Sequence, residues 1–151
     1  VAARNHFGHT TSRIDKISGK LPALQYYQLS LPAPKPPKGR FNKAAARRGK
    51  ALFDGAAKCA SCHVPGRFTE PGWNLHKPSE ICTDAFQADR SPDGMYRTTP
   101  LKGLFAHSKG GFYHDGRYKT LGQVVDHYNS CFNLGLTAGQ RSDLVQYLKS
   151  L

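Results

Sequence analysis

The feature that most restricts the fold of this chain is a pair of cysteines followed at once by a histidine, Cys59-Ala60-Ser61-Cys62-His63. The two intervening residues let one turn of backbone present both thiols, and the adjacent imidazole then reaches a metal from the same side. This spacing is the attachment signature of c-type haem, whose iron is held by the histidine. The motif predicts one covalent haem c, bound by Cys59 and Cys62 with His63 as the proximal iron ligand.

Two other chemistries use the same cysteine spacing. A thioredoxin-like redox pair normally lies in a β-α-β unit, and no such pattern surrounds Cys59. A structural zinc site needs a second close pair of ligands, whereas the remaining cysteines, Cys82 and Cys131, are isolated in the sequence. Haem is therefore the favoured interpretation, with zinc and thiol redox chemistry as its competitors.

Helical patterns lie on both sides of this motif. Asn42 is a candidate N-cap for a helix over residues 43–53, which are rich in Ala, Lys and Arg. Thr137-Ala138-Gly139-Gln140 has the pattern of a capping box and opens a closing helix with one apolar face. A third helix is predicted at residues 120–129, where apolar side chains recur at helical spacing.

The stretch between the motif and the last two helices has a different composition. Residues 64–119 are rich in Gly, Pro and Asp and predict loops. Loops of that length in a compact domain need something else to organise them, such as a cofactor. The fold class predicted is mostly α: a small cytochrome c-like helical domain over residues 41–151, with long haem-wrapping loops.

Positive charge is concentrated before this domain. The chain has a formal net charge of +12, and residues 1–50 contain eleven basic residues against one acid, Asp15. Residues 32–37, Pro-Ala-Pro-Lys-Pro-Pro, favour an extended strut. Residues 1–40 are therefore predicted to be an extended, basic, Pro-rich arm or linker, which either packs along the domain or connects it to another.

The charge and hydropathy limit the possible partners. Nucleic acid is disfavoured because residues 1–50 contain no reading motif and no aromatic residues interleaved with the charges. An acidic redox partner protein, docked in a salt-dependent way, is the better interpretation. No apolar run approaches the roughly 18 residues of a membrane span. The chain begins at Val1 without a signal peptide, which predicts a mature or trimmed form.

From Arg48 to the C-terminus, the sequence resembles the C-terminal haem domain of bacterial di-haem cytochrome c peroxidases and the related enzymes that mature methylamine dehydrogenase. Beside the haem motif, the resemblance rests on residues 96–104, 112–117, 120–129 and 143–151. Those peroxidases carry two haems, whereas this chain has a single Cys-x-x-Cys-His. An electron relay between two haems therefore cannot lie within these residues.

The second axial ligand of the iron has two candidates. Tyr128 lies on the apolar stripe of its predicted helix, shortly before the closing helix, and is the first choice. In the families that the chain resembles, the matching position is Met in peroxidases and Tyr in the maturation enzymes. Met95, the only methionine, is the second choice. An open site, with Tyr128 as a core aromatic residue, is the remaining alternative, and His127 is expected to be exposed.

Other side chains have predicted roles around the haem. Arg97 is expected to pair with a haem propionate, because guanidinium suits a carboxylate. His114 either bonds to a propionate or caps a loop. Haem c is attached outside the cytoplasm, in an oxidising setting in bacteria, which favours a disulfide between Cys82 and Cys131 over two buried free thiols. The expected location is periplasmic or otherwise extracytoplasmic.

Two functions follow from these expectations. The first is a c-type cytochrome with one covalent haem that transfers single electrons to or from a redox partner protein. The alternative is the haem domain of a peroxidase-like or partner-oxidising di-haem enzyme whose other haem domain is absent from this chain. The second would make the chain part of a larger haem protein or complex. Electron transfer is favoured over a free-standing enzyme, and no catalytic residue is assigned.

Overall fold

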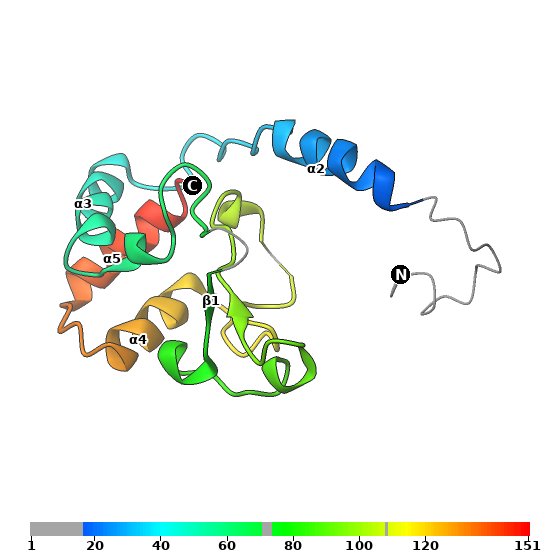
Figure 1. Cartoon of the computed structure of the whole chain (residues 1–151). Coiled ribbons are helices and arrows are strands. Elements are labelled where there is room, and N and C mark those ends of the chain that lie inside the picture. The colour runs from blue at the N-terminus through cyan, green and yellow to red at the C-terminus, as the bar shows by residue number, and fades with distance from the viewer. Residues whose placement is uncertain (1–16, 71–73, 108) are drawn as a thin grey trace. The chain divides into compact units, whose positions relative to one another are not determined.

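The computed structural model describes residues 17–151 except 71–73 and 108. The chain divides into two compact units, Val1–Ala33 and Pro34–Leu151. The regular structure of the described residues is mainly helical, with four α-helices, five short 3-10 helices and one pair of two-residue strands (Figure 1). This content agrees with the predicted mostly α class. None of the helices in this described part is long and apolar enough to cross a membrane.

The described part of the first unit contains the 3-10 helix η1 (Ser18–Lys20) and the helix α2 (Leu21–Ser30). Pro22 lies in the first turn of α2, where a missing backbone N–H costs nothing. The sequence did not predict this helix, because its leucines and tyrosines surround the axis instead of forming one stripe. None of its residues is buried.

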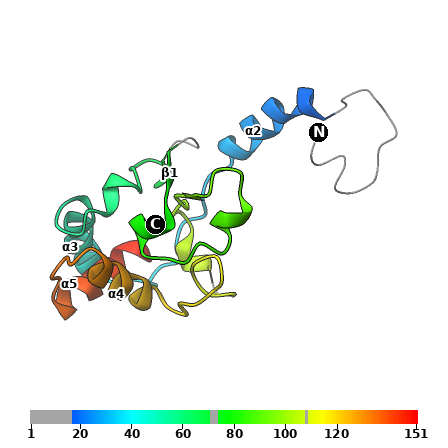
Figure 2. The ribbon, with the colours of Figure 1, turned by 60° about the horizontal axis from the view of Figure 1, so that its bottom comes forward.

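Three helices form one side of the second unit, and the loops form the other (Figure 2). The helix α3 (Lys43–Asp54) begins at Asn42, whose side chain accepts a hydrogen bond of 2.9 Å from the Ala45 N–H. The helices α4 (Leu121–Cys131) and α5 (Ala138–Leu148) both begin with a capping box. All three predicted helices are present. Those at residues 43–53 and 120–129 are confirmed to within two residues at each end, and the closing helix ends at Leu148.

The core of this unit lies where α3 crosses α5. Phe53 is only 1% exposed, and its ring meets that of Tyr147 edge to face at 5.1 Å between centroids. Leu144 and Leu148 from α5 and Val125 from α4 complete the same buried cluster. Burial of each such side chain stabilises the fold by about 1.5–3 kcal/mol.

The segment between η2 (Cys59–Ser61) and α4 contains little regular structure, as its composition predicted. Its two strands, β1 (Leu75–His76) and β2 (Tyr96–Arg97), pair antiparallel with Leu75 opposite Arg97. Three 3-10 helices interrupt the remaining loops: η3 (Pro78–Ile81), η4 (Ala88–Arg90) and η5 (Leu104–Ala106). This segment contributes His63, Leu101, Leu104 and Phe112 to the lining of the candidate site.

The contact between α3 and α5 depends on Gly49. A Cβ atom at this position would lie 2.1 Å from the carbonyl oxygen of Asp143 and 2.9 Å from Cβ of Tyr147. Gly49→Ala should therefore lower the free energy of unfolding by about 2 kcal/mol or more, because the two helices must move apart. Urea denaturation followed by circular dichroism measures this change.

Gly139→Ala is the matched control in α5. Gly139 is exposed, and an added Cβ would lie 4.0 Å from Oγ1 of Thr137, its nearest contact beyond its chain neighbours and the backbone of its own helix. This control should be neutral or should raise the stability by up to about 1 kcal/mol. Equal destabilisation by the two substitutions would contradict the close crossing.

Candidate functional site

A mainly apolar cavity of about 100 Å³ lies between the helices and the loops of the second unit. Its lining comes from α3, α4 and α5 and from the loops around η2 and η5. Most of the lining side chains are apolar, among them Phe53, Leu101, Leu104, Val125, Leu144 and Leu148. Three lining side chains carry groups that can bind a metal or a cofactor: Cys59, His63 and Tyr128.

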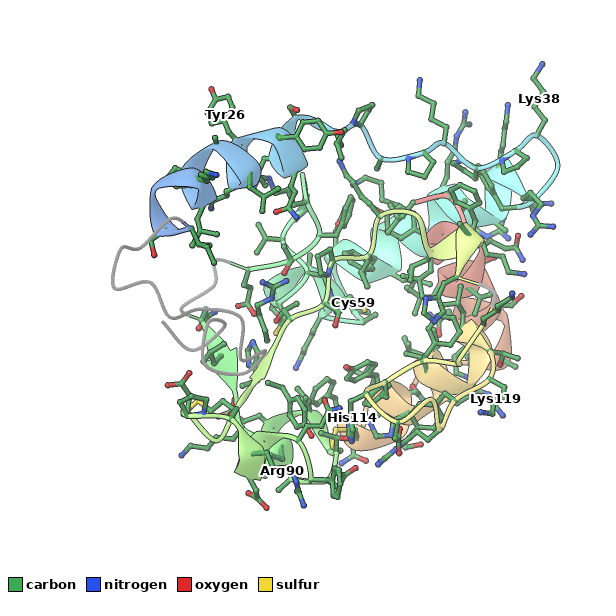
Figure 3. The ribbon with its side chains drawn as sticks, turned by 90° about the vertical axis from the view of Figure 1, so that its right-hand side faces the viewer. Tyr26, Lys38, Cys59, Arg90, His114 and Lys119 are labelled. Atoms are coloured by element: carbon green, nitrogen blue, oxygen red, sulfur yellow. A yellow bond between two sulfur atoms is a disulfide. The ribbon has the colours of Figure 1, made fainter. Side chains whose placement is uncertain are left out.

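The backbone around η2 brings Cys59 and His63 to the cavity together. Lys58 adopts a left-handed conformation with φ of 55°, which turns the chain out of α3 and into η2. The N–H of His63 then donates to the carbonyl of Cys59 at 2.9 Å and closes one helical turn. Cys59 and His63 both line the cavity, whereas Cys62 is half-buried beside it. Figure 3 shows Cys59 in the interior of the unit.

The His63 imidazole is held in one orientation by the loop that follows it. Nδ1 lies 3.1 Å from the carbonyl oxygen of Phe68, an acceptor, so Nδ1 carries the hydrogen and donates it. Burial lowers the pKa of His63, although the carbonyls of Phe68 and Thr99 favour the protonated form. The neutral imidazole therefore has its lone pair on Nε2, which is the state a metal ligand needs.

The two thiols of the motif differ in their surroundings. Burial raises the pKa of Cys59 to about 11, and its Sγ lies 3.4 Å from the carbonyl oxygen of Ala57. Burial also raises the pKa of Cys62, although a contact with the Ser61 hydroxyl opposes it. Both cysteines are therefore protonated at neutral pH, and neither has the lowered pKa typical of a redox-active pair.

Tyr128 reaches the cavity from α4, as its position on the apolar stripe predicted. Its ring stacks on Phe132 at 5.6 Å and lies 6.0 Å from the ring of Tyr113. Burial raises the pKa of the Tyr128 hydroxyl, while interaction with the Tyr113 hydroxyl opposes that rise. The structure thus brings the first-choice distal residue to the same cavity as His63.

Met95 and Arg97 lie elsewhere. Met95 is half-buried directly before β2, and Arg97 is an exposed residue of β2. Neither belongs to the lining of the cavity. From the sequence, Met95 is a candidate because it is the only methionine, and Arg97 because it adjoins the Thr-Thr-Pro segment. In that segment it is Thr98 that is buried.

A disulfide joins Cys82 and Cys131. It connects the residue that ends η3 to the last residue of α4, one turn beyond Tyr128. His127 strengthens the same connection, because its Nε2 donates to the carbonyl of Ile81 at 3.2 Å. Residues 81 and 82 are therefore tied to the helix that carries Tyr128.

The expectation that His127 is exposed is wrong. Its imidazole is half-buried and uses both nitrogens, one toward Ile81 and the other toward the Tyr118 hydroxyl at 2.8 Å. The helical periodicity correctly placed His127 on a face of α4 away from the apolar stripe, but loop residues cover that face. For His114 the sequence left two roles open, a propionate bond or a loop contact, and the structure shows a loop contact. Its Nε2 lies 3.2 Å from Oδ1 of Asp84, and its ring stacks on that of Tyr96.

Glu70 is a site residue that the sequence did not predict. Its carboxylate accepts hydrogen bonds of 2.6 Å from His76 Nε2 and from the Thr98 hydroxyl, and a further one from Asn74. Burial alone raises its pKa, but the hydrogen bonds outweigh this, and the pKa of Glu70 lies below its usual range. A single acid in a Gly- and Pro-rich loop has no pattern by which the sequence could reveal it.

Glu70 also lies close to the motif. One donor atom each of Cys62, Glu70 and His76 lies within 4.8 Å of the others. A sulfur, an oxygen and a nitrogen together form a donor set that zinc accepts. The zinc alternative therefore has a specific local candidate, which any test of haem attachment must distinguish.

The chain is similar to the methylamine utilization protein MauG of Methylorubrum extorquens, with 32% identity over 125 aligned residues. The alignment covers 72% of this chain and 35% of MauG, so the chain spans about a third of the length of that relative. This similarity supports the resemblance found from the sequence motifs. No family model matches the chain, and no solved structure matches it.

Proposed function

We propose that residues 41–151 form a cytochrome c-like domain that carries one covalent haem c and exchanges single electrons with a partner protein outside the cytoplasm. The observation that carries this proposal is the convergence of Cys59, His63 and Tyr128 on one apolar cavity. The haem supplies one-electron chemistry when bound, because its iron alternates between ferric and ferrous states.

The residues present fit this group. Cys59 and Cys62 are the thiols that would hold it covalently, and His63 is neutral with its lone pair on Nε2. The Leu, Val and Phe side chains around the cavity would exclude water from a bound haem and give its iron a low-dielectric setting. The disulfide between Cys82 and Cys131 agrees with an oxidising compartment.

Covalent attachment gives the direct test. When the chain is produced with a haem-attachment system, its mass should increase by one haem, and haem staining should remain in the denatured band. Cys59→Ser combined with Cys62→Ser should lose the stain, because no thiol remains for the vinyl groups. Cys82→Ser combined with Cys131→Ser is the matched control and should retain it.

A colourless protein of unmodified mass would contradict the haem assignment. Metal analysis then identifies the competitor, because a zinc site at Cys62, Glu70 and His76 would give about one zinc per chain. His76→Ala should remove that zinc, whereas it should leave a covalent haem in place.

Tyr128 is proposed as the distal ligand, with Met95 as the second choice. An anionic phenolate stabilises ferric iron, whereas a thioether favours the ferrous state. Tyr128→Phe should therefore give a high-spin ferric spectrum and raise the reduction potential. Met95→Leu should leave both unchanged, as should Tyr147→Phe, a buried tyrosine outside the lining. Loss of the long-wavelength band of Met ligation in Met95→Leu alone would assign the ligand to Met95.

The acidic partner is proposed to dock on a basic surface formed by Lys35, Lys38, Arg40, Lys43 and Arg47. All five are exposed, and none forms an ion pair with another described residue. No acidic residue occurs between Asp15 and Asp54. The field of such a surface steers an acidic protein into contact at low salt.

Charge reversal tests this docking surface. Lys38→Glu combined with Arg40→Glu should lower the association rate with an acidic redox protein about tenfold at low salt and reduce its salt dependence. The matched control is Arg90→Glu combined with Lys77→Glu, which changes the net charge equally. Arg90 and Lys38 lie at opposite edges of the unit in Figure 3. Equal loss of rate in both double variants would show an effect of net charge alone.

A second candidate function rests on the comparison with MauG. Because the matched region spans about a third of that relative, this chain also fits the role of one haem domain in a larger, peroxidase-like enzyme. That role needs a distal site that opens to peroxide. Titration of the ferric protein with hydrogen peroxide separates the two, because an electron carrier with a fixed distal ligand shows no rapid spectral change.

A further inference from the structure

A connected group of aromatic side chains lies beside the cavity. The ring of Tyr128 lies 6.0 Å from that of Tyr113 and 5.3 Å from that of His127. Tyr118 contacts both of these neighbours, with centroid distances of 5.0 Å to Tyr113 and 5.2 Å to His127. Ring contacts therefore connect Tyr128, in the lining of the cavity, to Tyr118 by two routes, one through Tyr113 and one through His127.

The hydrogen bonds of His127 determine where its proton lies. Nε2 faces the Ile81 carbonyl oxygen, which only accepts, so Nε2 carries the hydrogen in the neutral imidazole. Nδ1 is then an acceptor, and the Tyr118 hydroxyl donates to it at 2.8 Å. Tyr118 thus has a base with a free lone pair at hydrogen-bond distance from its phenolic proton.

No other tyrosine in the described part of the chain has this arrangement. The buried Tyr113 hydroxyl makes no hydrogen bond of good geometry among the described residues, and the Tyr96 hydroxyl donates to the backbone carbonyl of Asp84. A carbonyl is too weak a base to take the proton of an oxidised phenol. A phenol loses an electron far more readily when its proton can leave at the same time.

We propose that Tyr118 is a redox-active tyrosine and that His127 is its proton acceptor. One electron passes from the Tyr118 ring to an oxidant, and the O–H proton moves to Nδ1 of His127. The products are a neutral phenoxyl radical and an imidazolium, and an electron from a reduced partner reverses both transfers. In the protein the oxidant is a haem oxidised by hydrogen peroxide, so the biological role rests on the second candidate function, in which the distal site opens to peroxide. Tyr118 is half-buried and therefore accessible to a partner.

The experiment first uses an oxidant that needs no haem. The full chain is oxidised by photogenerated tris(bipyridyl)ruthenium(III), and radicals are trapped by freezing and measured by electron paramagnetic resonance. Ring-deuterated tyrosine identifies the signal. Tyr26 and Tyr27, which are exposed, are replaced by Phe in every variant. The chain that retains Tyr118 should then give a tyrosyl radical, and Tyr118→Phe should lose most of it. Tyr96→Phe is the matched control, because it removes a hydroxyl bonded to a carbonyl, and it should keep the radical.

His127→Gln tests the base itself. Gln can still accept a hydrogen bond but cannot take the proton, so Tyr118 should be oxidised about 100-fold more slowly, the size of a general-base contribution. Circular dichroism verifies that this variant is folded. An unchanged rate in folded His127→Gln, an unchanged radical in Tyr118→Phe, or no tyrosyl radical in the chain that retains Tyr118 would each overturn the proposal.

The second arm uses hydrogen peroxide on the haem-loaded protein. The same radical should form and should disappear in Tyr118→Phe. Failure of haem to attach would contradict the proposed function. The photochemical experiment would still test Tyr118, because its oxidant does not require haem. A haem-loaded protein that reacts with peroxide but forms its radical elsewhere would overturn the role of Tyr118.

Discussion

The close crossing of α3 over α5 is the contact on which the second unit depends. With no side chain at Gly49, the backbone of α3 lies directly against Asp143 and Tyr147. Phe53, one turn further along α3, belongs both to the core cluster and to the lining of the cavity.

The same crossing determines where the Cys-x-x-Cys-His motif enters. The N–H groups of Gly55 and Ala57 both donate to the carbonyl of Leu52, so the chain turns tightly after α3. Cys59 follows within two residues of that turn and so faces the wall formed by Phe53. The position of the motif relative to the cavity therefore follows from helix packing, and the loops need only close the other side.

A site residue can be predicted from the sequence when its interactions are with residues nearby in the chain, and not when its partners are far away in the chain. A capping box acts within four residues, so Thr137 marked the closing helix correctly. The structure shows the same box at Thr120, which was not predicted from the sequence. Periodicity along α4 placed Tyr128 inward for the same local reason. It failed for His127, because the loop residues Ile81 and Tyr118 that cover that side are not part of the helix pattern. Glu70 depends on Thr98, 28 residues away, and no local signal reports such a pair.

The strained positions of the backbone point to the same region of the molecule. Left-handed conformations cost roughly 1 kcal/mol per residue outside glycine and collect where a structure has a function to maintain. The described non-glycine residues with positive φ are Lys58, Phe68, Cys82, Tyr113 and Asn133. Asn133 directly precedes Leu134 of the cavity lining, and the other four hold parts of the candidate site in place.

Each of these four residues positions a different part of the site. Lys58 directs the chain into η2, and Phe68 presents the carbonyl that orients His63. Cys82 is bonded to the end of α4, and Tyr113 places its ring between Tyr118 and Tyr128. Tyr113 has a further cost, because its hydroxyl is buried without a good hydrogen bond. An unmade bond of that kind costs about 1–3 kcal/mol. A loop selected only for stability would lose such features, so their concentration around one cavity is independent support for a functional role of that cavity.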